Sequence, residues 1–188
     1  MRVVAGSVKG LPLKAVSGTS TRPTTDKVKE SIFNMIGPFF DGGNALDLFA
    51  GSGGLGIEAL SRGIDYVVFT EKDRKAVETI HFNLAKTRLE GQAEVYRADA
   101  ERALGVMKKN GFKARLLFLD PPYHMAKAYG LMDKAAEFGL MTEDSIVVCE
   151  HDKEVELGDR TKFFERYKKV VYGSTVISIY RFQGEEGE

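Results

Sequence analysis

The feature that most constrains the fold is a regular alternation of short apolar runs and helix-forming segments between residues 45 and 150. The runs that we interpret as buried strands are Ala45–Ala50, Tyr66–Glu71, Ala93–Ala98, Arg115–Asp120 and Ser145–Glu150. The helices expected between them are Leu55–Arg62, Arg74–Thr87, Ala100–Lys109 and Ala126–Phe138. A parallel connection needs a crossover of this length, whereas a hairpin does not. We therefore expect an α/β fold, with helices on both faces of a mostly parallel sheet.

The two ends of the chain break this alternation. Phe164–Tyr172 and Thr175–Phe182 are joined by only Gly173-Ser174, which predicts an antiparallel C-terminal hairpin. At the other end, residues 2–16 suit a small β-hairpin, and a helix capped by Thr25 or Asp26 should run to about Ile36. We divide the chain into an N-terminal hairpin extension (1–24), a main domain (25–183) and an acidic tail (184–188).

A glycine-rich segment, Asp47–Gly56, follows the first strand and opens a helix. Gly51, Gly53 and Gly56 match the G-x-G-x-x-G pattern, in which glycines allow a sharp turn and a close approach to a ligand. Glu71 ends the next strand, where its carboxylate would accept hydrogen bonds from ribose hydroxyls. This context predicts a nucleotide-like cofactor. The candidate cofactor-binding residues are Asp47, Phe49, Ala50, Gly51, Ser52, Gly53, Glu71, Asp99 and Ala100.

The glycine motif alone does not separate a nicotinamide dinucleotide from S-adenosylmethionine, because both carry an adenosine. Asp47 favours the second, since a carboxylate there would receive the methionine ammonium. Asp99 ends the third strand, where it would bond the adenine amino group. It would serve equally as the N-cap of the following helix, and the two roles are compatible.

The most specific motif is Asp120-Pro121-Pro122-Tyr123, which directly follows four apolar residues. Two prolines cannot continue a strand, so Asp120 and the Pro121 carbonyl should be fixed at its carboxyl end. Two acceptors there would take both N–H bonds of an exocyclic amino group and leave the nitrogen lone pair free to attack a methyl group. Asp120 would offset the developing positive charge, and Tyr123 would offer a face for a base to stack on. We take Asp120, Pro121 and Tyr123 as the candidate catalytic residues.

Composition narrows the function classes. The chain has 27 basic and 27 acidic residues, yet residues 1–36 carry six basic residues against two acidic ones. Its single cysteine and three scattered histidines do not have the spacing of a metal site. No apolar run approaches the roughly 20 residues that cross a bilayer, and because the first residues do not form the apolar segment of a signal peptide, we expect none. We expect a monomeric cytoplasmic protein without a metal.

These motifs and the segments Arg2–Gly6, Arg22–Asn34 and Asn83-Leu84 resemble the RsmD-type family. The resemblance spans nearly the whole chain. It implies a Rossmann-like class I fold, S-adenosylmethionine as methyl donor, and a guanine N2 amino group in small-subunit (16S) ribosomal RNA as target, within a ribosomal subunit. The family's N-terminal hairpin often carries a tryptophan, which this chain lacks. The candidate RNA-binding residues are Arg2, Lys9, Arg22 and Lys27.

Other functions stay open at this stage. A DNA adenine or protein-glutamine N-methyltransferase shares the catalytic motif, although Asn usually replaces Asp120 in the glutamine enzymes. More distant alternatives are an NAD-binding Rossmann protein and a non-catalytic RNA-binding domain. Because the glycine motif lies far along the chain from residues 1–16, we also expect that deletion of those residues would spare cofactor binding.

Overall fold

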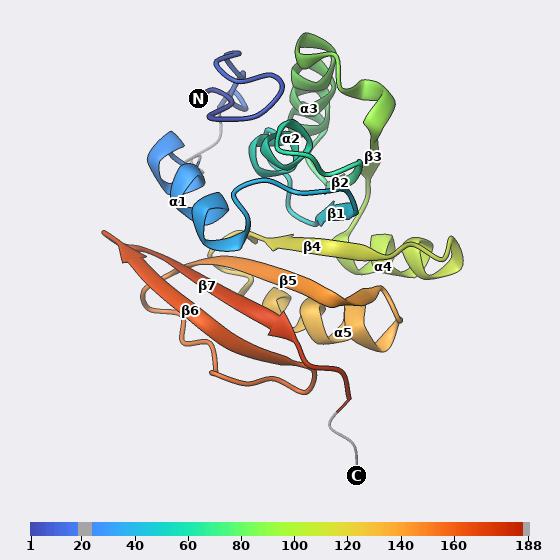
Figure 1. Cartoon of the computed structure of the whole chain (residues 1–188), viewed down its shortest axis with the longest axis vertical. Coiled ribbons are helices and arrows are strands. Elements are labelled where there is room, and N and C mark those ends of the chain that lie inside the picture. The colour runs from blue at the N-terminus through green and yellow to red at the C-terminus, as the bar shows by residue number, and fades with distance from the viewer. Residues whose placement is uncertain (19–23, 186–188) are drawn as a thin grey trace.

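The computed structural model describes residues 1–18 and 24–185. Seven strands form one sheet in the order β3-β2-β1-β4-β5-β7-β6 (Figure 1). The first five in this order run parallel, and β7 pairs antiparallel with both β5 and β6. The predicted parallel sheet and its antiparallel C-terminal hairpin are therefore confirmed.

The elements follow the sequence pattern closely. The strands are β1 Asn44–Asp47, β2 Tyr66–Glu71, β3 Ala93–Arg97, β4 Ala114–Leu119, β5 Met141–Asp152, β6 Phe164–Tyr172 and β7 Thr175–Phe182. The helices are α1 Asp26–Ile36, α2 Gly54–Ser61, α3 Arg74–Thr87, α4 Ala100–Lys109 and α5 Leu131–Glu137, with short 3-10 turns η1 Glu90–Gln92 and η2 Ala126–Gly130. Thr25 caps α1, where its side chain accepts a hydrogen bond from the Val28 amide.

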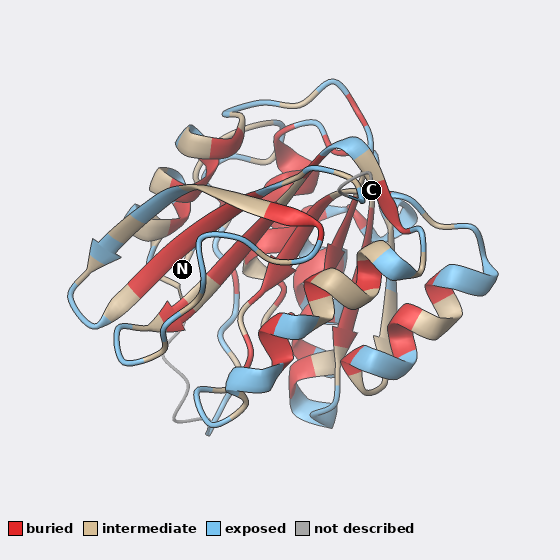
Figure 2. Cartoon of the chain, turned by 90° about the horizontal axis from the view of Figure 1, so that it is seen from below, coloured by how far each residue is buried: buried red, intermediate tan, exposed pale blue. Residues whose placement is uncertain are grey.

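The sheet separates two apolar cores. Helices α1, α2 and α3 cover one face, with Phe33, Ile57 and Ile80 packed against strand residues such as Phe118. Helices α4 and α5 cover the other face, where Leu104 packs. The buried strands at the centre of the sheet and the half-buried helices around it are visible in Figure 2. This sandwich explains why the central strands are apolar on both sides.

Three predicted bounds differ most from the structure. The first strand ends at Asp47 rather than at Ala50, because the chain leaves the sheet to begin the glycine loop. The last parallel strand begins at Met141, four residues before the predicted start. Polar residues follow Met141, so this part of the strand does not show the apolar pattern, and the register against β4 is irregular there. The predicted helix over 126–138 is a 3-10 turn followed by the short helix α5.

The predicted N-terminal β-hairpin is reduced to one isolated bridge, between Arg2 and Pro12. The amides of Val4 and Ala5 do not extend a ladder, because both donate to the Glu58 carboxylate. The segment is nevertheless part of the main core, since Val3 is fully buried against α1 and α2.

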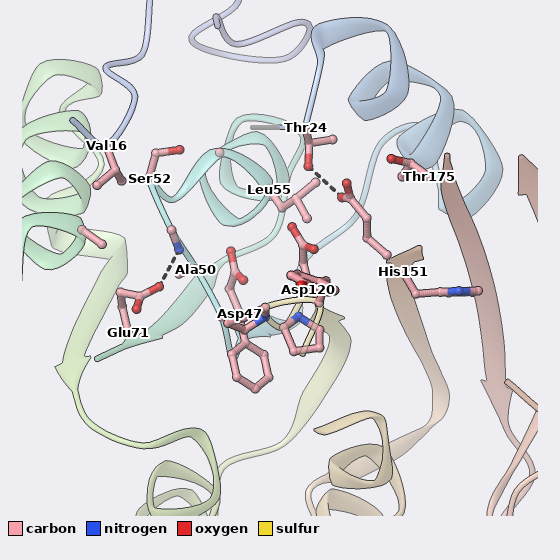
Figure 3. Close-up of a pocket in the computed structure, with 18 of the residues that line it drawn as sticks. Val16, Thr24, Asp47, Ala50, Ser52, Leu55, Glu71, Asp120, His151 and Thr175 are labelled. Carbon is pink, nitrogen blue, oxygen red and sulfur yellow. Dashed lines mark hydrogen bonds between the residues drawn. The ribbon is translucent and has the colours of Figure 1, made fainter. Parts of the chain in front are cut away.

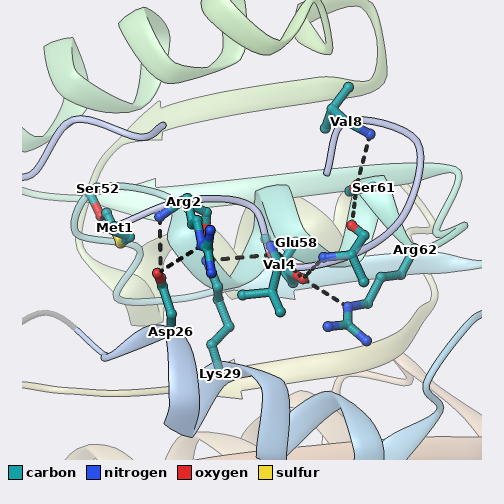
Figure 4. Close-up of polar contacts among 12 residues, drawn as sticks. Met1, Arg2, Val4, Val8, Asp26, Lys29, Ser52, Glu58, Ser61 and Arg62 are labelled. Atoms are coloured by element: carbon teal, nitrogen blue, oxygen red, sulfur yellow. Dashed lines mark hydrogen bonds and ion pairs between the residues drawn. The ribbon is translucent and has the colours of Figure 1, made fainter. Parts of the chain in front are cut away.

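Glu58 holds this segment in place. Its side chain is fully buried on α2 and forms ion pairs with Arg62 Nε at 2.9 Å and with Lys29 Nζ at 3.4 Å (Figure 4). Lys29 also donates to the Arg2 carbonyl. A buried carboxylate is tolerated when it is paired and fully hydrogen-bonded, as this one is. The N-terminal segment, α1 and α2 are thus joined at one buried carboxylate.

Candidate active site

A cavity of about 790 Å³ opens where several parallel strands end. Its walls come from the glycine loop, the end of β2, the turn after β4 and the end of β5. Ligands of open α/β sheets bind at this edge. The structure brings these sequence-predicted residues into the one cavity: Asp47, Phe49, Ala50, Gly51, Ser52, Glu71, Asp120, Pro121 and Tyr123.

The three glycines of the motif serve different purposes. Gly51 and Gly53 have φ values of +56° and +84°, which side chains rarely adopt, and Gly53 is the N-cap of α2. A Cβ on Gly51 would meet no atom within 4 Å, so the loop backbone faces open space. A Cβ on Gly56 would lie 2.3 Å from the Phe69 ring, so this glycine permits close packing of α2 on β2. Gly53 itself does not line the cavity.

Glu71 is fixed by backbone amides. Its Oε2 accepts from the Gly51 amide at 2.9 Å, which ties the glycine loop to the end of β2 (Figure 3). Its Oε1 accepts from the amides of Lys72 and Asp73 at 2.8 and 3.2 Å. The carboxylate therefore has a fixed position at the cavity wall, and it can still accept a hydrogen bond from a ligand.

Asp47 ends β1 beneath the glycine loop and is only 2% exposed. Burial and the nearby Glu71 charge raise its pKa to about 7, and a hydrogen bond from the Gly56 amide at 3.3 Å opposes that shift. Figure 3 shows Asp47 and Asp120 side by side in the cavity. A buried carboxylate that is costly to ionise is well suited to a cationic ligand, which would stabilise its charged form.

Asp120 stands at the end of β4, before the diproline turn. The Met125 amide donates to the Pro122 carbonyl at 2.8 Å and closes this turn. Burial and the charges of Glu150 and Asp47 raise the pKa of Asp120 well above its ordinary value. Within residues 1–18 and 24–185 no group donates a hydrogen bond to its side chain, and a partly buried carboxylate without a donor indicates a ligand position.

Tyr123 lies at the rim of the cavity and is 85% exposed. Its ring meets His124 edge to face, with the ring centroids 6.1 Å apart. An aromatic ring that is not covered by the protein offers a stacking face to a planar ligand.

Sequence reasoning missed a further acid in the cavity, Glu150 of β5. Its carboxylate accepts a hydrogen bond from the Thr24 hydroxyl at 2.7 Å, drawn dashed in Figure 3. Burial raises the pKa of Glu150, and the Thr24 hydrogen bond opposes that shift. Like Asp120, it directly follows a run of buried apolar residues, although β5 continues to Asp152, and this signal was available in the sequence.

The N-terminal segment also lines the cavity, through Met1, Ala15 and Val16. Asn83 of α3 connects this segment to the glycine loop: its Nδ2 donates to the carbonyls of Lys14 and Ser52, both at 2.9 Å. The separation on which we based the survival of cofactor binding without residues 1–16 is therefore absent, since this segment and the glycine loop share one wall. Residues distant in sequence form one wall, which spacing along the chain does not reveal.

Several candidate residues lie outside the cavity. Asp99 is the N-cap of α4, accepts from the Glu101 amide at 3.0 Å and pairs with Lys72 at 3.0 Å, and Ala100 is buried behind it. Lys9 and Lys27 are exposed on the surface. The Arg2 side chain is 67% exposed and lies 3.6 Å from Asp26. Arg22 lies outside the described residues.

The described ranges contain neither a metal-binding cluster nor a helix that could span a membrane. No three His, Cys, Asp or Glu side chains of residues 1–18 and 24–185 are grouped so that they could hold a metal ion. In the same ranges, no helix combines the length and the apolar character needed to cross a membrane.

Comparison with known proteins places this architecture among methyltransferases. The family model described as conserved hypothetical protein 95 matches residues 1–181. The solved structure of the putative methyltransferase yhhF from Escherichia coli aligns with a TM-score of 0.80 and 29% identity, over 98% of this chain and 99% of that one. The predicted Rossmann-like methyltransferase fold is thereby confirmed.

Two relatives carry names that state a substrate class. The putative rRNA methyltransferase YlbH of Bacillus subtilis (strain 168) is 54% identical over 184 residues, which cover 98% of this chain and 100% of YlbH. Ribosomal RNA small subunit methyltransferase D of Escherichia coli (strain K12) is 28% identical over 185 residues, which cover 98% of this chain and 91% of that protein.

Proposed function

The chain belongs to the conserved hypothetical protein 95 family, the RsmD family that its sequence resembles, and from this premise we propose an S-adenosylmethionine-dependent rRNA methyltransferase. Its target is the exocyclic N2 amino group of a guanine in small-subunit ribosomal RNA. The observation that carries the proposal is Asp120, a carboxylate that receives no hydrogen bond from the described residues and shares one cavity with the glycine loop. The names of the relatives support ribosomal RNA as the substrate class.

The charge of the cavity favours S-adenosylmethionine over a dinucleotide. Asp47, Glu71, Asp120 and Glu150 all line it. Of the lysines in the described residues only Lys29 lines it, and Lys29 is paired with Glu58 on α2. A pyrophosphate would meet these acids unfavourably, whereas a ligand with an ammonium and a sulfonium would neutralise them. When bound, S-adenosylmethionine supplies a methyl group on its sulfonium sulfur.

Each candidate residue then has a role toward the methyl donor. Asp47 would hold the ammonium, and Glu71 would accept the ribose hydroxyls. The open backbone of Gly51 would allow the donor to approach closely. Asp99 lies outside the cavity and pairs with Lys72; it would bond the adenine amino group with the lone pairs that its capping role and this ion pair leave free, and Ala100 would pack nearby. Phe49, Ala50, Ser52 and Gly53 complete the loop around the donor.

The acceptors at the end of β4 would prepare the target nitrogen. The amino group of guanine is a poor nucleophile, because its lone pair is delocalised into the ring. Asp120 and the Pro121 carbonyl would take its two N–H bonds, so that the lone pair turns toward the methyl group. Asp120 then offsets the positive charge that develops on nitrogen and accepts the proton that leaves. A raised pKa makes this carboxylate a stronger base. Tyr123 would stack on the base.

The RNA would approach across the N-terminal side of the molecule. Phe82 of α3 is 50% exposed, and the amines of Lys14 and Lys86 lie 5.2 and 6.0 Å from its ring centroid. An aromatic ring flanked by cations suits single-stranded RNA, through stacking and phosphate contacts. This surface adds to the basic residues Lys9 and Lys27 in supporting an RNA substrate.

Titration calorimetry and single-turnover kinetics test the proposal. The wild-type protein should bind S-adenosylmethionine and not NAD. Asp120→Ala should lower turnover by about 10²-fold or more with donor affinity nearly unchanged, because the lost interaction is made in the transition state. Glu156→Ala, which removes an exposed carboxylate between β5 and β6 that does not line the cavity, is the matched control. Tight NAD binding without S-adenosylmethionine binding would falsify the methyltransferase assignment.

A further inference from the structure

We propose that Glu150 is a specificity-determining residue that accepts the N1–H of the target guanine, beside the N2 amino group held by Asp120. The inference deepens the proposed function and rests on it. It assigns to this carboxylate the distinction between guanine, which presents N1–H, and bases that present a bare N1.

The sheet places the two acids next to each other. Leu119 of β4 pairs with Cys149 of β5, so Asp120, the first residue after β4, is level with Glu150 of the adjacent parallel strand. Neighbouring strands lie about 4.8 Å apart. Phe118 and Val148 belong to the core under α1, α2 and α3, and side chains two residues further along a strand share that face. Both carboxylates therefore face the same cavity, which each of them lines.

Glu150 is held in place at two points. The Thr24 hydroxyl donates to its Oε2 at 2.7 Å, and the Tyr129 hydroxyl donates to its backbone carbonyl at 2.6 Å. Among residues 1–18 and 24–185 no group donates to its Oε1, which leaves that oxygen for a ligand. A donor on one carboxylate oxygen also favours the ionised form. Thr24 belongs to the segment before α1 that carries the family resemblance, and this contact gives the residue a function.

The chemistry of the purine edge separates the candidate bases. Guanine has N1–H and the N2 amino group side by side, two donors for two neighbouring carboxylates. 2-Aminopurine keeps the 2-amino group but has a lone pair at N1, so Glu150 would face it acceptor against acceptor. Adenine also presents a bare N1. A site built to accept an N–H discriminates strongly against an analogue that lacks it, because a desolvated acceptor is left unpaired.

A purely structural role for Glu150 predicts a different outcome. The contact with Thr24 also fastens the segment before α1 to β5, and its loss would lower stability and overall rate. That loss would affect guanine and 2-aminopurine substrates equally. The ratio of kcat/KM for the two bases therefore isolates base recognition from folding.

The experiment uses small-subunit particles reconstituted with rRNA that carries guanine or 2-aminopurine at the mapped target position. Wild-type protein should prefer guanine by about 10²-fold or more in kcat/KM. Glu150→Gln should reduce this ratio at least about tenfold, because the side-chain amide can turn to donate to N1. Thr24→Val should also reduce the ratio, and Thr24→Ser, which keeps the hydroxyl, should preserve it.

The outcomes separate this inference from the function on which it rests. If Glu150→Gln slows both substrates and leaves the ratio at the wild-type value, Glu150 is structural and the inference is overturned. The same holds if wild-type protein methylates 2-aminopurine as readily as guanine. If wild-type protein methylates neither base, the proposed function itself fails. Thermal unfolding of each variant verifies that the compared proteins are folded.

Discussion

Replacement of Asp47 by Asn should make the protein more stable at pH 8 while leaving its stability at pH 4 nearly unchanged. Asp47 is buried under the glycine loop, and its pKa is raised to about 7 from an ordinary value of 3.8. Asn has the same shape, and its carbonyl oxygen would keep the hydrogen bond from the Gly56 amide. The substitution therefore removes little besides the charge.

The size of this stability difference follows from the protons that the folded and unfolded states bind. Between about pH 4 and pH 7 the folded protein holds the Asp47 proton, whereas the unfolded chain has released it. The free energy of unfolding therefore falls as pH rises, by about 1.4 kcal/mol per pH unit. Above the folded-state pKa both states have released the proton, and the free energy falls no further. Over the interval the loss approaches about 4 kcal/mol as an upper bound. The carboxamide of the Asp47→Asn variant cannot ionise, so the variant should avoid this loss.

Urea denaturation followed by circular dichroism, on both proteins from pH 4 to pH 8.5, measures the difference. The stability gain of the variant should grow with pH to about 2–4 kcal/mol. At the same time the variant should bind S-adenosylmethionine more weakly, because the partner of the ammonium is gone. A difference in unfolding free energy that stays constant across this pH range would refute the burial of an ionisable Asp47.

Three other predictions test separate parts of the site. Glu150→Gln removes a charge that raises the pKa of Asp120, so the acid limb of the pH profile of kcat/KM should move to lower pH; an unmoved limb contradicts their interaction. Asn83→Ala should lower the unfolding free energy by about 1–3 kcal/mol and weaken S-adenosylmethionine binding in calorimetry. Wild-type affinity in that variant would separate the N-terminal segment from the cofactor site. Lys9→Ala should reduce the slope of log K for RNA against log salt by about one, and an unchanged slope would place Lys9 away from phosphate.

The sequence predicts most of the fold because local signals agree with the tertiary structure. The bounds of β2, α3, α4, β6 and β7 match the predicted ranges. For the helices the reason is local: Asp73 and Asp99 cap α3 and α4 through their own side chains. The two motifs at the ends of β1 and β4 are equally local, since glycines and prolines specify backbone geometry within a few residues.

The missed parts of the site depend on contacts between distant residues. Thr24 meets Glu150 across 126 positions of the sequence, and Asn83 meets Lys14 across 69. No periodicity or spacing encodes such pairs. The N-terminal hairpin was mispredicted for the same reason: the amides of Val4 and Ala5 are satisfied by Glu58, a residue of α2, whereas Val3 and Leu13 still donate across the turn to Leu11 and Met1. A charged residue that would be expected at the surface from sequence alone can thus be buried as the hydrogen-bond acceptor of backbone amides.

The most direct test of the central claim is nucleoside mass spectrometry of small-subunit ribosomal RNA from cells that lack the gene. One culture is complemented with the wild-type protein and another with Asp120→Ala. We predict N2-methylguanosine at one position with the wild-type protein, and its loss with the variant. N6-methyladenosine in its place, or equal N2-methylguanosine in the two cultures, would contradict the assignment of Asp120 to the methylation of a guanine amino group.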